Sequence, residues 1–158
     1  MTLTYQRGQA VAYAHRWAYG RNPAYYDFDL IGGDCTNFIS QCLYAGCGVM
    51  NYTRDTGWYY SSPDDRAAAW SGVAYLHRFL TRNRGPGPYA AEWPLPSAQA
   101  GDIVQLSFDD SVFSHSLFVV EAQPDILIAT HSYDSDRRPL GSYSYRLARL
   151  LHIEGVRG

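Results

Sequence analysis

Residues 30–48, "LIGGDCTNFISQCLYAGCG", contain all three cysteines of the chain and decide the fold prediction. From Cys35 onward apolar residues recur at helical spacing, and Gly46 is expected to end the helix. Asp34 precedes the pattern directly, so Cys35 lies in the first turn of the predicted helix. Asp34 is a favourable N-cap residue, and we expect its carboxylate to accept a hydrogen bond from the backbone N–H of Asn37.

This spacing gives the three cysteines different chemical environments. Only the thiolate of a cysteine is nucleophilic, and the open N–H groups and dipole at the start of a helix favour an anion there. Cys35 has that position, and its backbone N–H could also bind an oxyanion. Cys42 lies two turns later and is expected in the core, whereas Cys47 follows the predicted helix stop. The alternative is that all three are small buried hydrophobic residues.

The rest of the chain predicts an α+β fold in one domain, residues 1–158. Further helices are expected over residues 5–19 and 65–82, the second with a restart at Ser71–Gly72, and residues 83–101, rich in Pro and Gly, are expected to form a cleft loop. The periodicity then changes to that of strands. Because helices come first and strands follow, we expect an antiparallel sheet. The predicted strands are residues 102–108, 116–122, 126–132 and 143–153.

The composition narrows the range of possible functions. The chain is 46% hydrophobic with a net charge of −2, which is typical of a globular protein, and it lacks the basic block of a nucleic-acid-binding protein. All 13 cationic side chains are Arg, so no Lys can act as a base or Schiff-base former. No signal peptide or membrane span is predicted, which favours the cytoplasm but leaves action at the cell wall open. Three cysteines without a CxxC motif argue against a disulfide scaffold or zinc knuckle.

A cysteine nucleophile needs a base, and two histidines on adjacent predicted strands are candidates. If residues 122–124 form a three-residue loop, Glu121 faces Asp125 and His115 lies opposite His131. Both rings would then share one face of the sheet. We assign His115 as general base and then acid, with His131 as the group that orients it.

Other polar residues have simpler expected uses. Asp134 or Asp136 could replace His131 as the orienting group, but both fit turn chemistry better. His15 and His77 are expected on the surface, and His152 is expected to be structural. The tyrosine-rich composition is consistent either with core packing or with a cleft for peptides or glycans.

Three motifs together resemble the putative amidase domain of the papain-like cysteine hydrolases, which is related to NlpC-type and CHAP cell-wall hydrolases. They are "GGDCTNFISQCL", "GDIVQLS" leading to "SHSLFVV", and "THSYDSDRRPL", and the resemblance covers nearly the whole chain. It implies a papain-like fold in which the cysteine heads a helix packed on an antiparallel sheet. It also implies Cys35 as nucleophile, His115 as base and His131 as the third polar residue. A tyrosine near the oxyanion, corresponding to Tyr26, is implied at a shorter spacing than in NlpC-type proteins.

We therefore expect cysteine-dependent hydrolysis of an amide through an acyl-enzyme, with no metal or cofactor. The resemblance implies a peptide substrate, and peptidoglycan stem peptide in particular. Three alternatives stay open: a non-hydrolytic binding module for peptides or glycans, an acyltransferase, and a zinc site formed by Cys35, His115 and His131.

Overall fold

The apolar stripe that begins at Cys35 forms α2 (Cys35–Cys47), the central helix in a computed structural model that describes residues 1–158. The helix ends at Gly48, which adopts a left-handed conformation and donates its N–H to the Tyr44 carbonyl at 2.8 Å. The predicted stop at Gly46 is wrong. A side chain there would meet Tyr5 at 2.6 Å, so this glycine allows close packing instead, and Cys47 is the last residue of the helix.

Three other helices accompany α2. They are α1 (Arg7–Trp17), α3 (Ala68–Ser71) and α4 (Val73–Arg82). The restart predicted near Gly72 is confirmed, because Gly72 has an extended backbone conformation between α3 and α4. The predicted helix start at residue 65 is wrong, since β3 (Asp65–Arg66) pairs there with β2 (Tyr60–Ser62). No helix is both long and apolar enough to cross a membrane.

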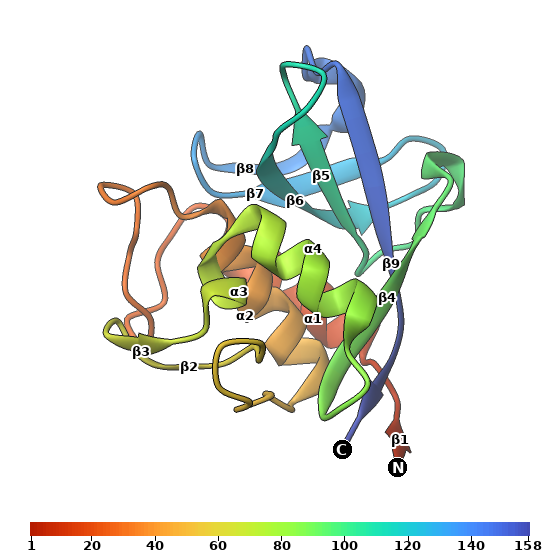
Figure 1. Cartoon of the computed structure of the whole chain (residues 1–158). Coiled ribbons are helices and arrows are strands. Elements are labelled where there is room, and N and C mark those ends of the chain that lie inside the picture. Colours follow the sequence, from red (N-terminus) through yellow and green to blue (C-terminus); the bar gives the residue numbers. More distant parts are fainter.

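The C-terminal half forms most of an antiparallel sheet, as predicted. Its strand order is β1-β9-β5-β6-β7-β8, and β4 pairs with the second edge of β9. Every pairing is antiparallel, so the fold is α+β with helices packed against this sheet (Figure 1). The strands are β1 (Thr2–Leu3), β4 (Gly87–Trp93), β5 (Ile103–Ser107), β6 (Phe113–Glu121), β7 (Leu127–Thr130), β8 (Ser135–Pro139) and β9 (Leu147–Arg157).

Strand β4 was not expected, because residues 83–101 are rich in Pro and Gly. Within this segment Tyr89, Ala90 and Ala91 pair with β9, while the glycines and prolines lie mainly at its ends. The proline-rich end is a short 3-10 turn, Leu95–Ser97. The predicted long cleft loop is therefore wrong.

Alternation along the strands builds two cores, one on each face of the curled sheet. Phe118 and Val120 of β6 join the larger core, which lies between the sheet and α1, α2 and α4. Leu117 and Val119 face the other way and pack in a smaller core with Leu140. In Figure 1, β5 runs toward the top of the molecule and β6 returns from it, so the start of β6 lies at that end.

Candidate active site

Cys35 is held at the junction of α2 and β6. Its side chain is buried, with 8% of its surface exposed. The backbone N–H groups of Ser116 and Thr36 are directed at the sulfur, and the Thr36 hydroxyl lies 3.8 Å from Sγ. Thr36 Oγ1 is in turn 3.0 Å from Ser116 Oγ. These contacts fix the first turn of α2 to the strand that carries His115.

His115 directly precedes Ser116 in β6, so the imidazole is one residue away from the N–H that faces Cys35 Sγ. The His115 ring makes no hydrogen bond with any residue, including Cys35. Its nitrogens are not among the buried polar atoms without a partner, so they reach solvent. His115 is therefore free to exchange a proton with a molecule that enters the site.

The predicted register between β6 and β7 is wrong. Glu121 pairs with Leu127 and not with Asp125, and an irregularity follows Val119, which pairs with Ile128. Extending the Val119–Ile128 register places residue 131 opposite Ser116, so the two histidines lie on opposite faces of the sheet. His131 consequently does not orient His115.

His131 instead pairs with Asp34. Its Nδ1 lies 2.5 Å from Asp34 Oδ2, and its Nε2 lies 2.8 Å from the Trp17 carbonyl oxygen. A carbonyl only accepts, so Nε2 carries a proton, and a single further proton is shared between Nδ1 and the carboxyl group. The buried pair thus has no net charge. The ring also stacks on Phe38 with centroids 4.1 Å apart.

Asp34 does not cap α2 through its side chain, so the predicted bond to the Asn37 backbone is wrong. Its Oδ1 accepts hydrogen bonds from the Phe28 N–H and the Asn37 side-chain amide, each at 2.8 Å. Asn37 Nδ2 also donates to the Tyr26 carbonyl at 2.9 Å, and Trp70 donates to Asn37 Oδ1. Asn37 and Asp34 therefore fasten the loop before Cys35 to the core, and Tyr26 takes part through its backbone.

Tyr143 is a site residue that the sequence did not indicate. Its ring centroid is 6.0 Å from that of His115, and the guanidinium of Arg138 lies over it at 3.7 Å. The hydroxyl is buried but has no hydrogen-bond partner. A buried hydroxyl without a hydrogen bond is costly, and the polar side chains near this oxygen are those of Ser135 and Arg138.

Burial controls the protonation of Cys35 and His115, the two candidate reacting groups. It raises the pKa of the Cys35 thiol, and the nearby Asp34 carboxylate acts in the same direction, while the N–H groups of Ser116 and Thr36 oppose the rise. Burial lowers the pKa of His115 to about 4, with a further contribution from the Arg138 charge. The expected activation of Cys35 by the helix start is thus outweighed by desolvation. Near neutral pH the resting site holds a thiol and a neutral imidazole.

The remaining polar candidates form hydrogen bonds or ion pairs with residues other than Cys35 and His115. Asp134 forms an ion pair with Arg21 at 3.0 Å, and Asp136 pairs with His15 at 2.8 Å. His77 contacts Glu92, so neither His15 nor His77 is simply solvated. His152 bonds to buried Asp102 at 2.9 Å, in agreement with a structural role. The alternative zinc set is not assembled, because both nitrogens of His131 are already bound.

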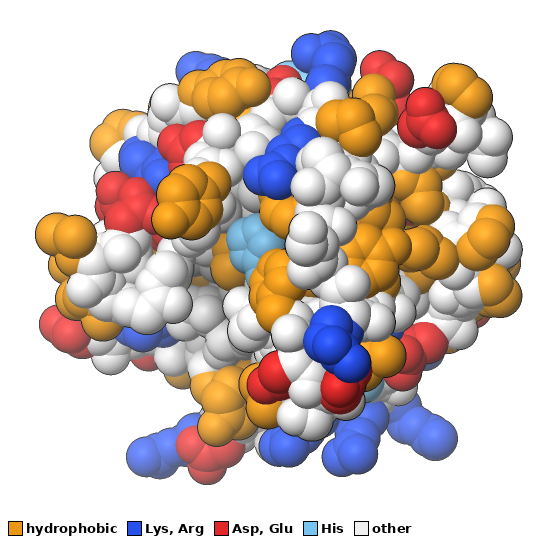
Figure 2. Space-filling view, turned by 90° about the horizontal axis from the view of Figure 1, so that it is seen from above, with side chains coloured by type: hydrophobic (Ala, Val, Ile, Leu, Met, Phe, Trp, Pro, Cys, Tyr) orange, Lys and Arg blue, Asp and Glu red, His pale blue; other side chains and the backbone are white.

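The surface at this end of the molecule is hollowed. Figure 2 views the molecule from the end at which β6 begins and shows a histidine ring in a depression bordered by hydrophobic side chains. Exposed hydrophobic residues occur on both segments that lead to the site. Leu30 and Ile31 precede Cys35, and Val112 precedes His115. The cleft can therefore accept an apolar or amphipathic chain.

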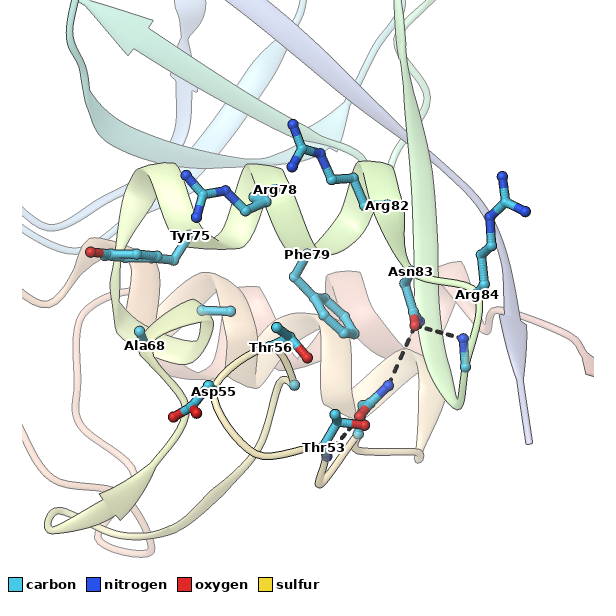
Figure 3. A pocket seen from close by; sticks show the side chains of 14 residues that line it. Thr53, Asp55, Thr56, Ala68, Tyr75, Arg78, Phe79, Arg82, Asn83 and Arg84 are labelled. Carbon is cyan, nitrogen blue, oxygen red and sulfur yellow. Dashed lines mark hydrogen bonds between the residues drawn. The ribbon is translucent and has the colours of Figure 1, made fainter.

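A separate hollow of about 390 Å³ lies on the other side of α4, between this helix and residues 51–57 (Figure 3). Phe79 and Asn83 line it, but Cys35, His115 and Tyr143 do not. The hollow is therefore not the site of the chemistry that these three residues support.

Comparison with known proteins indicates amide hydrolysis in general terms. Protein YhbB of Bacillus subtilis (strain 168), itself uncharacterized, is 34% identical over 145 residues, covering 85% of this chain and 43% of its own length. The chain thus spans less than half of that relative. No solved structure matches the chain. A family model described as "Putative amidase domain" matches residues 4–153, and the chain belongs to this family.

Proposed function

We propose that the protein hydrolyses an amide bond with Cys35 as nucleophile and His115 as general base and acid. Membership in the putative amidase domain family supports amide hydrolysis in general. One observation carries the cysteine mechanism. Cys35 Sγ lies against the Ser116 N–H, and the preceding residue, His115, has an imidazole without any hydrogen bond.

In the first step, the Cys35 sulfur attacks the substrate carbonyl carbon while its proton moves to His115. This transfer has to accompany the attack, because the pKa shifts leave both groups neutral in the resting site. Hydrogen bonds in a resting site are often incomplete and form when substrate binds. His115 then gives the proton to the leaving amine, and the C–N bond breaks.

The second half of the cycle returns the enzyme to its starting state. A water molecule loses a proton to His115 and attacks the thioester carbonyl, after which the C–S bond breaks. The carboxylic acid product leaves, and the proton on His115 returns to the Cys35 sulfur. Atoms balance with water as the only co-reactant, so the cycle requires no metal or cofactor.

Charge that develops on the carbonyl oxygen needs hydrogen-bond donors. The first backbone N–H groups of α2 are donors that have no partner within the helix. The Tyr143 hydroxyl is a further donor, since it is buried without a partner beside His115. We assign Tyr143 to the binding of the substrate carbonyl, in place of Tyr26.

The finer part of this proposal has three elements: the site has a papain-like arrangement, the protein is related to NlpC-type hydrolases, and the substrate is a cell-wall peptide. The helix-head cysteine and strand-borne histidine support the arrangement. The apolar border of the cleft supports a peptide chain as substrate (Figure 2). A site of action at the cell wall follows only if that substrate is correct.

The test is digestion of peptidoglycan and of a synthetic peptide panel, with new amines and carboxylic acids identified by mass spectrometry. We expect product from wild type and a loss of about 10³-fold or more in Cys35→Ala, because the residual groups cannot form an acyl-enzyme. Cys47→Ala is the matched control at the other end of α2 and should retain activity. Equal rates for Cys35→Ala and wild type would refute the mechanism.

A further inference from the structure

A second hollow, of about 270 Å³, lies between α4 and the sheet and contains three arginines. Arg78 and Arg82 are one turn apart on α4, and Arg149 comes from β9. Figure 3 shows Arg78 and Arg82 extending from the side of α4 that faces away from Thr53 and Thr56. In Figure 1 the strands β5, β6 and β9 lie on that side.

None of these three arginines forms an ion pair, although the charge of Glu92, which pairs with His77 in the lining, acts on Arg149. Arg149 is half-buried, and both of its hydrogen bonds, at 2.7 and 2.9 Å, go to the neutral Gln105 Oε1. Arg78 and Arg82 make no hydrogen bond or ion pair, although like charges one helical turn apart repel. Arg78 and Arg82 are exposed, so only Arg149 has lost part of its hydration, which is unfavourable unless an anion accompanies the guanidinium. An anionic ligand would remove this cost.

The hollow is connected to the candidate active site through buried hydrogen bonds. Gln105 Nε2 donates to the Val73 carbonyl at 3.0 Å and to Ser116 Oγ at 3.3 Å. Ser116 is the residue whose N–H faces Cys35. Gln105 is therefore the one side chain between Arg149 and Ser116. It also contacts Val73, the first residue of α4.

Helix geometry sets the distances along this path. With a rise of about 1.5 Å per residue, Arg78 and Arg82 lie roughly 8 and 14 Å beyond Val73 along α4. An extended peptide covers about 3.3 Å per residue. The two arginines are thus about 6 Å apart along the helix and suit acidic groups about two residues apart in an extended substrate.

We infer that the hollow formed by Arg78, Arg82 and Arg149 binds carboxylates of an acidic peptide substrate, on one side of the amide bond that is cut. This inference deepens the proposed function and takes its cleft as given. Arginine forms paired hydrogen bonds with carboxylates. A nucleic acid is a poorer fit, because the one ring in the lining on which a base could stack is the imidazole of His77, which is already paired with Glu92.

The test measures binding to Cys35→Ala protein, so that no turnover is involved. The probes are two fluorescein-labelled hexapeptides with identical sequences, except that one has two Glu residues where the other has Gln. Fluorescence anisotropy should give about tenfold tighter binding of the Glu peptide, and added salt should weaken it. Replacing both exposed arginines, Arg78→Gln with Arg82→Gln, should abolish this preference.

Arg54→Gln is the matched control, because exposed Arg54 is flanked in the sequence by Thr53 and Asp55, which line the other hollow (Figure 3) and not this one. It should change the affinity by less than about twofold. Equal binding of the two peptides, an equal loss in Arg54→Gln, or tighter binding of a single-stranded oligonucleotide would overturn the inference. Failure of the proposed hydrolysis would instead appear as absence of product from wild type, and it would leave this binding comparison intact.

Discussion

His115 and His131 are the same residue type on neighbouring strands, but their surroundings differ completely. Both nitrogens of His131 are bound, and its ring is buried against Phe38. His115 has no hydrogen bond, and its nitrogens reach the cleft. A general base must exchange a proton with substrate, which His131 cannot do without breaking the Asp34 pair. The comparison shows that free capacity for hydrogen bonding distinguishes the proposed base, His115, from the fully bonded His131.

The comparison predicts its largest effect for His115→Asn. Asparagine keeps a similar polar shape but cannot accept the Cys35 proton, so kcat/KM for amide hydrolysis should fall by about 10²- to 10⁴-fold. The free energy of unfolding at neutral pH should stay close to that of wild type, since the ring has no hydrogen bond to lose. His77→Asn is the control and should keep full activity. A His115→Asn enzyme as active as wild type would show that another group is the base.

The second effect concerns stability. His131→Asn removes the nearest charged partner of the buried Asp34 carboxylate and leaves Arg21 Nε at 3.7 Å, so we expect the free energy of unfolding to drop by about 3 kcal/mol. Urea denaturation at neutral pH measures this drop. Activity per folded molecule should decrease far less than in His115→Asn.

The double variant Asp34→Asn with His131→Asn sharpens this point. Because it removes the charge and its partner together, its destabilisation should be smaller than the sum of those of the two single variants. Strict additivity would mean that the pair does not act as a unit. The contrast between His131 and His115 would then rest on the unbonded ring of His115 and no longer on the Asp34–His131 pair.

Much of the fold could be predicted, because it follows from local periodicity. The helix at Cys35, the break at Gly72 and the antiparallel sheet all have clear sequence patterns. Strand β4 could not be predicted, since its pairing with β9 is a long-range contact and the prolines and glycines at its ends suggest a loop. Strand β8 was missed for a similar reason. It is short, polar and at the sheet edge.

The site was predictable only in part. The position of Cys35 at the first turn of a helix follows from spacing, and His115 is one residue away from the Ser116 N–H that faces the sulfur because β6 packs against α2. The partner of His131 depended on a register that an irregularity in β6 changes by one residue. Tyr143 carried no local signal at all. The raised pKa of Cys35 depends on burial, which the pattern at the start of the helix does not specify.

The smallest predicted effect follows from the lowered pKa of His115. Burial holds this pKa at about 4, compared with 6.5 for an exposed histidine. As the pH falls from 6.5 toward 4, the unfolded chain takes up a proton at His115 that the folded protein does not, so folding becomes less favourable. The loss amounts to at most about 3 kcal/mol over this range and is absent above pH 6.5.

Urea denaturation of wild type and His115→Asn at pH 7, 5.5 and 4.5 isolates this contribution, because the other titrating groups are common to both proteins. The difference in unfolding free energy between them should shift in favour of His115→Asn as the pH is lowered. Parallel curves for wild type and His115→Asn would mean that His115 is solvated like an ordinary surface histidine, and the contrast between the two rings would then rest on hydrogen bonding alone.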